Sequence, residues 1–438
     1  MNRVISPSSL SGVLRVLPSK SASHRAVLCC ALAQGVCEVS PLQLSMDVRA
    51  TLACAKALGF AQDVQTQPLG GTLEGFVAAR ITGGGVFTGG DLREADCGES
   101  GSTLRFLMPL ALDGRGPVRL IGHGRLMERP QDVYRELFGG LGVSWRDESG
   151  AIVLEGKLRG GDYRLRGDIS SQFITGLLFA LPLCDADSTL TLTTDLESGA
   201  YVQLTREMQS RFGVCSEWQD TRTLRIPGCQ RYNAPERVQV EGDWSHAAFY
   251  MVAGAIAEGG ACVRLTGLLA DSSQGDRACV DVLCAMGADI RWEGEALCIR
   301  PSRLHGCVID AAQIPDLVPA LCVAACAAEG ETRIQNAARL RIKECDRLMA
   351  MRTELQKLGA YVDEMLDGLV IRGGRRLRGG QVDAWNDHRI AMALCVASAL
   401  CEGELTLRGA ESVQKSAPAF YREFESLGGM TRALDLGE

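Results

Sequence analysis

The sequence predicts an α/β protein built from six repeats, each with about two helices and several strands. Two patterns support this fold class. An apolar residue followed by glycine ends a helical segment at spacings of 83, 71, 74, 72 and 69 residues, at Gly59, Gly142, Gly213, Gly287, Gly359 and Gly428. A strongly apolar, alanine-rich helix also occurs once in each repeat. Each of these glycines fits a helix end that requires left-handed backbone.

The apolar helices are expected over HRAVLCCALAQG, STLRFLMPLALDG, SQFITGLLFALPL, AAFYMVAGAIAEG, LVPALCVAACAAEG and RIAMALCVASALCEG. Helices that are apolar all round belong in a core, whereas the second helix of a repeat, such as CDRLMAMRTELQKLGA, has a polar face. Stretches rich in β-branched residues, such as VRLIG, LTLTT and GLVIRG, predict strands between them. A large α/β protein without repeats could also contain glycine-terminated helices at this density.

The composition is that of a soluble enzyme, with 438 residues, 46% hydrophobic residues and a net charge of −7. The length suits two or three domains, and the acidic total argues against general nucleic-acid binding. The start, MNRVISPSSLSG, lacks the pattern of a signal peptide, so a cytoplasmic protein is expected. The 18 cysteines are scattered through apolar segments, which predicts free thiols rather than disulfides or zinc ligands.

Polar residues gather where the apolar helices begin, and some of them are ordinary helix caps. The cations among them, such as Lys20 and Arg25, lie near the positive end of a buried helix. That position is unfavourable unless an anion lies close by. Helix N-termini that carry Ser, Gly and Arg form phosphate or carboxylate sites. Several such ends together would bind a ligand with more than one negative group.

Eight short motifs occur in a fixed order along nearly the whole chain: PSKSASHR at 18–25, SGSTLR at 100–105, MERP at 127–130, GDISSQF at 167–173, QGD at 274–276, IPD at 314–316, RIKECDRL at 341–348 and NDHRIAM at 386–392. In this combination the chain closely resembles the 5-enolpyruvylshikimate-3-phosphate synthase family of enolpyruvyl transferases. The resemblance implies transfer of the enolpyruvyl group of phosphoenolpyruvate to the 5-hydroxyl of shikimate 3-phosphate, with release of phosphate. This reaction belongs to the shikimate pathway of chorismate and aromatic amino-acid biosynthesis.

The resemblance also implies a two-domain inside-out α/β barrel in which six βαβαββ repeats enclose the apolar helices. Three repeats would form one domain over residues 20–234, and three would form a second domain from residues 1–19 and 235–438. The segment PGCQRYNAP would cross between the domains. The active site would lie in the cleft between them, and closure would remove water from an anionic pocket.

The matching motifs also imply the residues that hold the two substrates. Shikimate 3-phosphate would be bound by Lys20, Ser21, Arg25, Ser170, Ser171, Gln172, Ser198, Asp316, Arg339 and Lys343. Phosphoenolpyruvate would be bound by Lys20, Gly101, Arg129, Gln172, Arg347, Arg389 and Lys415. Arginine suits this second ligand because it can chelate two oxygens, and glycine lets the backbone approach closely.

A carboxylate must accept the proton of the attacking hydroxyl, and the resemblance assigns this catalytic role to Asp316. Glu344 and Lys20 are implied to move the proton that is added to the methylene carbon, and their division of labour stays open. Taken alone, Asp316 could simply cap the helix that follows it, and Arg347 could belong to a solvated helix face. No cofactor or metal is expected, because the sequence has neither a nucleotide-binding loop nor metal-ligand spacing.

Several residues depart from the family's pattern: Glu99, Trp244, His246, Arg339 and the residues after Pro418, where an acidic side chain is usual. None of these changes removes a principal charge. A side chain larger than that of Gly101 would crowd phosphoenolpyruvate, which predicts that the enzyme is a glyphosate target.

Two alternatives remain open. The sister enzymes that transfer enolpyruvyl to UDP-N-acetylglucosamine usually carry a cysteine shortly before an Arg-Pro pair, where this chain reads GHGRLMERP. A non-catalytic anion-binding protein of the same fold would not need Asp316, Glu344 and Lys20 together. The expected partners are therefore the two small-molecule substrates, with no nucleic acid and no membrane, and a monomer is expected.

Overall fold

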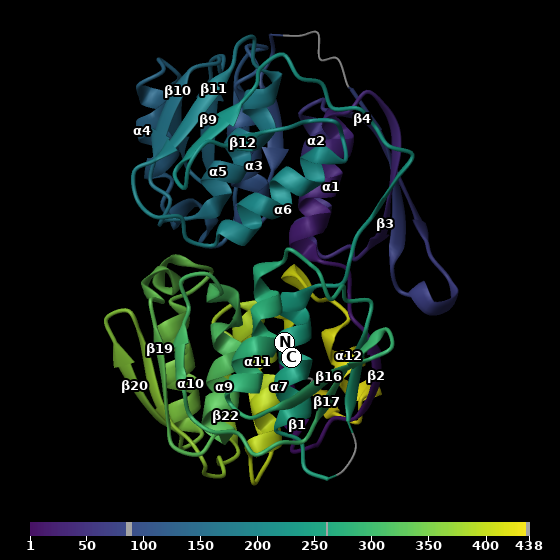
Figure 1. The fold of residues 1–438 in the computed structure, drawn as a ribbon, viewed down its shortest axis with the longest axis vertical. Helices are drawn as coiled ribbons and strands as arrows, with labels where there is room; N and C mark the ends of the chain where they lie inside the picture. The colour runs from purple at the N-terminus through teal and green to yellow at the C-terminus, as the bar shows by residue number, and fades with distance from the viewer. Residues whose placement is uncertain (85–89, 260–261, 435–438) are drawn as a thin grey trace. The chain divides into compact units, whose positions relative to one another are not determined.

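The computed structural model describes residues 1–84, 90–259 and 262–434, and the chain divides into two compact units (Figure 1). The continuous unit comprises residues 18–240. The discontinuous unit comprises residues 1–17 and 241–438. The chain therefore passes between the units after Leu17 and after Val240, and the segment PGCQRYNAP, residues 227–235, lies inside the continuous unit instead of forming the crossing.

The continuous unit contains three βαβαββ repeats in its described residues. The first consists of β14 (Arg237–Gln239), α1 (Lys20–Leu32), β3 (Gly35–Leu42), α2 (Met46–Ala57), β4 (Ala61–Pro68) and β5 (Val77–Gly83). The second consists of β6 (Arg93–Asp96), α3 (Gly101–Ala111), β7 (Val118–Ile121), α4 (Asp132–Gly139), β8 (Ser144–Glu148) and β9 (Ala151–Glu155). The third consists of β10 (Asp162–Leu165), α5 (Ser171–Ala180), β11 (Ser188–Leu192), α6 (Gly199–Ser210), β12 (Glu217–Trp218) and β13 (Thr223–Ile226).

The discontinuous unit contains three more such repeats in its described part, two of which take a strand from the N-terminal segment. The first consists of β2 (Gly12–Arg15), α7 (Trp244–Ala255), β15 (Val263–Thr266), α8 (Cys279–Ala285), β16 (Asp289–Glu293) and β17 (Ala296–Arg300). The second consists of β18 (Val308–Asp310), α9 (Val318–Ala327), β19 (Glu331–Gln335), α10 (Arg347–Lys357), β20 (Tyr361–Met365) and β21 (Gly368–Arg372). The third consists of β22 (Gly380–Asp383), α11 (His388–Ala397), β23 (Leu405–Arg408), α12 (Phe420–Ser426), β24 (Met430–Leu434) and β1 (Asn2–Ser6).

Each repeat forms its own four-stranded mixed sheet. The first two strands are parallel, as in β6 with β7, and the others pair antiparallel, as in β7 with β9 and β8 with β9. A parallel pair needs a crossover, and the inner helix supplies it where the two strands follow one another in the chain, as α3 does between β6 and β7. The predicted α/β class and the strands expected at VRLIG, LTLTT and GLVIRG are confirmed as β7, β11 and β21.

The alternating helices have the two predicted environments. All residues of α7 and α11 are buried, and α1 and α9 are almost as completely enclosed. In Figure 1, α7, α9 and α11 lie side by side within the discontinuous unit, where they pack on one another. The outer helices α2, α4, α6, α8, α10 and α12 each end just before a glycine with positive φ, at Gly59, Gly142, Gly213, Gly287, Gly359 and Gly428. This confirms the glycine pattern read from the sequence.

The starts of the inner helices are mostly capped by side chains. Ser19, Ser100, Ser170, Asp243 and Asp387 each accept a hydrogen bond from a backbone N–H in the first turn. The described residues include no helix with both the length and the hydropathy needed to cross a membrane. Within the same residues, no cluster of three or more His, Cys, Asp or Glu side chains is arranged to hold a metal ion.

Candidate substrate site

At the start of α1, the cation that the helix dipole disfavours has a carboxylate partner. Lys20 Nζ lies 3.0 Å from Oδ2 of Asp47, which is in the first turn of α2. Both side chains are more than four-fifths buried. The sequence patterns did not identify Asp47 as a site residue. Its position two residues after the Ser45 cap is nevertheless typical of an acidic residue in a first helical turn. Asp47 thus fixes Lys20 at the N-terminus of a buried helix.

Arg25 is held by several protein acceptors within the core. Its Nε donates to Oγ1 of Thr205 at 2.8 Å, and its other nitrogens donate to the carbonyls of Ser21 and Tyr201. Burial lowers the pKa of Arg25 to about 10. Ser198 is buried just before α6, the helix that carries Thr205, and has a left-handed backbone with φ of 54°. Arg25 therefore joins the start of α1 to α6.

Gln172 is the centre of a polar network between α3 and α5. Arg105 Nη1 donates to its Oε1 at 2.8 Å, and its Nε2 donates to Oγ of Ser102 at 2.9 Å. Arg105 is itself buried, and its Nη2 donates to the carbonyl of Pro130. Ser170 caps α5 and accepts from the backbone N–H of Gln172, while Ser171 is buried in the first turn. Arg105, in the motif SGSTLR, orients Gln172, a role that the motif alone did not assign.

Gly101 lies directly against the guanidinium of Arg129. A Cβ atom on this glycine would lie 2.8 Å from Nη1 of Arg129 and 3.0 Å from its Cζ. Arg129 is buried and follows the short 3₁₀ turn of residues 126–128. A side chain at this position, at the N-terminus of α3, would require the guanidinium of Arg129 to shift.

In the discontinuous unit, Asp316 lies among three cations. Its Oδ1 accepts from Nη1 of Arg347 at 2.9 Å and lies 3.7 Å from Nζ of Lys343, and its Oδ2 accepts from Nη2 of Arg389 at 2.9 Å. The helix that follows has no side-chain cap. The alternative that Asp316 serves as a helix cap is therefore wrong, and its carboxylate faces the cationic cluster instead.

Arg347 is the hub of this cluster. Its side chain is only 1% exposed, so the alternative of a solvated helix face is wrong for this residue. Its Nε donates to Oδ2 of the fully buried Asp387 at 2.8 Å, and its Nη2 donates to Oε2 of Glu344 at 2.8 Å. Asp387 also caps α11 through the N–H of Arg389. The sequence motifs contain Asp387 but assign it no role, and in the structure it anchors both arginines.

Three other predicted cations surround this group. Lys343 has a pKa lowered from 10.5 to about 8, mainly because burial penalises its charge, although Asp316 opposes that effect. Arg339 is buried and donates from Nη2 to the carbonyl of Ala312. Lys415 Nζ donates to the carbonyl of Asn386, the residue before Asp387, at 2.6 Å.

Two unusual residues of the motif GDWSHAAF also have defined partners. Trp244 is buried with its ring edge-on to Trp292. His246 lies 2.7 Å from Oε2 of Glu423, which also accepts from the hydroxyl of Tyr250. Both departures therefore have partners of their own within the discontinuous unit.

A buried carboxylate that the sequence reasoning missed lies near Asp316. Asp276 of the motif QGD accepts a hydrogen bond from the hydroxyl of Ser245, at the start of α7. Burial and the negative charge of Asp316 raise the pKa of Asp276 from 3.8 to about 6, while Arg389 acts in the opposite direction. Only the packing of the repeats reveals this second carboxylate.

The predicted residues thus form one polar group in each unit. The continuous unit brings together the helix starts that carry Lys20, Ser21, Arg25, Gly101, Ser170, Ser171 and Gln172, with Arg129 beside Gly101. The discontinuous unit brings together Asp316, Lys343, Glu344, Arg347 and Arg389. Each group offers cations and hydrogen-bond donors at the ends of buried helices, which is the chemistry that phosphates and carboxylates require.

Known proteins with similar sequences and folds agree with this chemistry. The EPSP synthase (3-phosphoshikimate 1-carboxyvinyltransferase) family profile matches residues 4–424. The 3-phosphoshikimate 1-carboxyvinyltransferase of Clostridium kluyveri is 44% identical over 427 residues, which cover 97% of each chain. That of Clostridium perfringens is 43% identical over 98% of this chain and 99% of its own.

Solved structures extend the agreement to the fold. The EPSP synthase from Acinetobacter baumannii aligns with a TM-score of 0.78 and 25% identity over 99% of this chain and 100% of its own. The enolpyruvyl transferase NikO from Streptomyces tendae shares the fold, with a TM-score of 0.76 and 19% identity over 98% of each chain. Because the family profile and the sequence relatives span almost the full length, the chain belongs to the EPSP synthase (3-phosphoshikimate 1-carboxyvinyltransferase) family.

Proposed function

We propose that this chain transfers the enolpyruvyl group of phosphoenolpyruvate to the 5-hydroxyl of shikimate 3-phosphate, giving 5-enolpyruvylshikimate 3-phosphate and phosphate. The observation that carries the proposal is the carboxylate of Asp316 between the guanidiniums of Arg347 and Arg389. A proton acceptor next to anion-binding cations is what an addition of a hydroxyl to an anionic enol ether needs. Family membership supports the same substrates.

The two substrates divide the polar residues between them in this proposal. The phosphate of shikimate 3-phosphate binds the hydroxyls, amide and cations of the continuous unit, Ser21, Arg25, Ser170, Ser171, Gln172 and Ser198, with Lys343 and Arg339 from the discontinuous unit. Phosphoenolpyruvate binds Lys20, Gly101, Gln172, Arg129, Arg347, Arg389 and Lys415. In this proposal, residues of both units contact the same pair of ligands.

Asp316 acts as the general base in the proposed mechanism. Its carboxylate takes the proton of the 5-hydroxyl as that oxygen attacks the substituted carbon of phosphoenolpyruvate. A proton is added to the methylene carbon by Glu344 or Lys20, which gives a tetrahedral intermediate. Loss of a proton from the same carbon and departure of phosphate then regenerate the carbon–carbon double bond. Arg347 and Arg389 stabilise the negative charge that builds up on the leaving phosphate.

The test is phosphate release by the purified protein with phosphoenolpyruvate and shikimate 3-phosphate. Asp316→Asn keeps the shape of the side chain and removes its basicity, so kcat should fall by about 10²–10⁴. Asp363→Asn, at an exposed carboxylate of the same unit, is the control and should retain full activity. Phosphate release only with UDP-N-acetylglucosamine as acceptor would assign the chain to the sister reaction, and no release with either acceptor would contradict the proposed function.

We also propose that the enzyme works as a monomer in the cytoplasm. All eighteen cysteines are free, and thirteen of them are buried, which suits a reducing compartment. A net charge of −7 favours separate molecules in solution. Light scattering on the purified chain should give the mass of one copy, 46.9 kDa, and a dimer mass would refute the monomer. Fractionation of the producing cells tests the compartment.

A further inference from the structure

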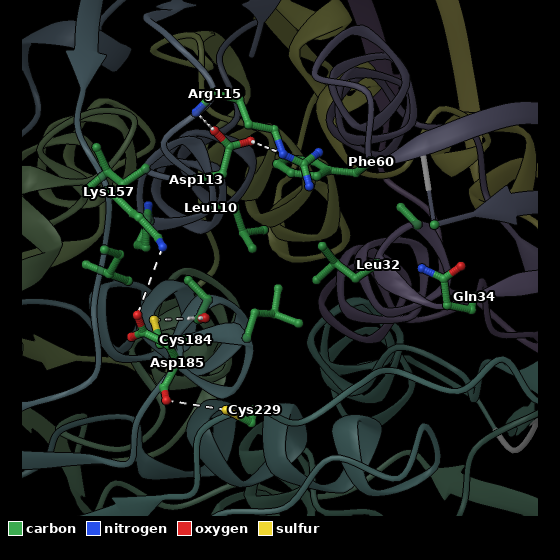
Figure 2. Close-up of a pocket in the computed structure, with 17 residues that line it drawn as sticks. Leu32, Gln34, Phe60, Leu110, Asp113, Arg115, Lys157, Cys184, Asp185 and Cys229 are labelled. Carbon is green, nitrogen blue, oxygen red and sulfur yellow. Dashed lines mark hydrogen bonds and ion pairs between the residues drawn. The ribbon is translucent and has the colours of Figure 1, made fainter. Parts of the chain in front are cut away.

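A pocket of about 390 Å³ lies within the continuous unit, at the C-terminal ends of its three inner helices (Figure 2). Leu32 of α1, Leu110 of α3 and Ala180 of α5 all line it. The N-terminal ends of the same helices carry Lys20, Gly101 and Gln172. Helices of 10 to 13 residues are about 15–20 Å long, so the pocket is separate from the residues proposed to bind substrate.

The wall of the pocket is largely apolar. Besides Leu32 and Leu110, it includes Phe60, Leu158 and Leu183. Figure 2 shows the leucines of α1 and α3 facing the central space, with Lys157 and Asp185 on one side and Gln34 on the other. A volume of about 390 Å³ equals that of about thirteen waters, so a molecule of about a dozen non-hydrogen atoms fits. Such an apolar wall suits an apolar group of that size.

The rim of the pocket carries charges of both signs. Lys157 and Asp185 lie 4.0 Å apart and are more than half exposed, so their ion pair is long and weak. Asp113 is already paired with the buried Arg93 through two bonds of 2.7 Å, which leaves the charge of Arg115 in excess. The side chain of Arg115 is 44% exposed, and its guanidinium lies 4.0 Å from Asp113, although its backbone N–H donates to Oδ1 of Asp113 at 2.9 Å. The rim therefore offers cations for a carboxylate.

The same rim also favours a cationic group. The carboxylate of Asp185 is one acceptor, and the C-terminal ends of α1, α3 and α5 each add a partial negative charge. A ligand with a carboxylate and an ammonium group could thus replace the long Lys157–Asp185 pair with two shorter ion pairs. A purely anionic or purely cationic ligand would satisfy only one of these two side chains.

From this combination of an apolar wall and a rim with both charges, we infer that the pocket binds an α-amino acid with a large apolar side chain. Its carboxylate contacts Lys157 and Arg115, its ammonium group contacts Asp185, and its side chain lies against Leu32, Leu110 and Leu183. This inference concerns a second site, and it does not depend on the function proposed for the first.

The test is calorimetric titration of the full-length chain with L-phenylalanine in the absence of substrates. Phenylalanine amide, which lacks the carboxylate, and 3-phenylpropanoate, which lacks the ammonium group, should each bind at least about tenfold more weakly. Absence of binding of L-phenylalanine at millimolar concentrations, or equal binding of the three compounds, would overturn the inference.

Variants locate the binding. Lys157→Met and Asp185→Asn should each weaken L-phenylalanine binding by about tenfold, because each removes one charged contact. Leu183→Trp fills the pocket from a half-exposed position and should abolish binding. Lys56→Met is the matched control, since Lys56 is as exposed as Lys157 in the same unit but does not line the pocket. Unchanged binding in Leu183→Trp, with the fold intact by circular dichroism, would contradict the assignment.

Discussion

A Cβ atom on Gly101 would lie 2.8 Å from Nη1 of Arg129, closer than such atoms normally approach. In Gly101→Ala the guanidinium must therefore move, and Arg129 is one of the cations proposed to bind phosphoenolpyruvate. We expect KM for phosphoenolpyruvate to rise by about tenfold or more, with a smaller effect on KM for shikimate 3-phosphate. Steady-state kinetics with each substrate varied in turn measure both values.

The matched control for this substitution is Gly139→Ala. Gly139 is the last residue of α4, and a Cβ atom there would meet nothing within 4 Å. Its kinetics should equal those of the unchanged enzyme. An equal rise of both KM values in Gly101→Ala would point to general damage to the helix, and would contradict the specific effect on Arg129.

The same geometry predicts the response to glyphosate. With Gly101 in place, we expect competitive inhibition against phosphoenolpyruvate in the micromolar range, and Gly101→Ala should weaken that inhibition. Initial rates over a series of inhibitor concentrations test this expectation. An enzyme that is not inhibited in that range would show that Gly101 does not control access of this compound.

The second prediction concerns the buried pair of Arg347 and Asp387. Asp387→Asn removes a negative charge that Arg347 contacts at 2.8 Å, and leaves a guanidinium with 1% exposure beside a neutral amide. Breaking one partner of a buried pair costs about 3–5 kcal/mol of unfolding free energy. Urea denaturation of the variant and the unchanged protein measures the difference.

A surface pair provides the comparison. Asp147→Asn disrupts the contact of Asp147 with Arg135, in which both side chains are about half exposed. The resulting decrease in unfolding free energy should be below about 1 kcal/mol. A similar small effect in Asp387→Asn would mean that Arg347 does not depend on this carboxylate.

The third prediction follows from Lys343, whose pKa is lowered to about 8 chiefly by burial. Above pH 8 the free enzyme loses this cation, so kcat/KM for shikimate 3-phosphate should decrease between pH 7.5 and 9. Lys343→Arg retains its charge over this range and should lack that decrease. A pH profile with the same alkaline limb in both proteins would assign the titration to another group.

Much of the fold could be predicted from the sequence because it depends on local patterns. The glycines at the ends of the outer helices and the all-apolar inner helices are features of consecutive residues, and both were confirmed. Two repeats of the discontinuous unit each take one strand, β1 or β2, from the N-terminal segment. The local patterns did not show this, because a short strand such as GVLR carries little signal alone. Pairing of β2 with β15 depends on residues about 250 positions apart.

The site could be predicted only as a list of residues. Motifs named Asp316 and Arg347, but the contact between them depends on how α9 and α10 pack. Asp47 was missed, and Arg105 and Asp276 belonged to motifs that gave them no role, because each acts on a residue far away in the sequence. An isolated Asp or Arg gives no sign of its partner. Burial was also not evident for Arg347, since its helix carries charged residues on both sides in the sequence.

The last prediction concerns Asp276, whose pKa is raised to about 6 by burial and by the nearby charge of Asp316. Between about pH 4 and pH 6 the folded protein holds a proton on this carboxyl that the unfolded chain has lost. Unfolding then releases a proton, so the contribution of Asp276 to stability decreases as the pH rises through this window and is constant above it. The slope is at most about 1.4 kcal/mol per pH unit for one proton.

The amide in Asp276→Asn does not titrate. The unfolding free energy of the unchanged protein minus that of this variant should therefore decrease from pH 4.5 to pH 6.5. Urea denaturation of both proteins at several pH values gives that difference, and Asp271→Asn, at an exposed residue of the same segment, controls for general pH effects. A difference that is the same at all pH values would show that Asp276 is ionised throughout. The acidic neighbour of Asp316 would then be a permanent charge, and the cations around both carboxylates would have to balance two negative charges at every pH.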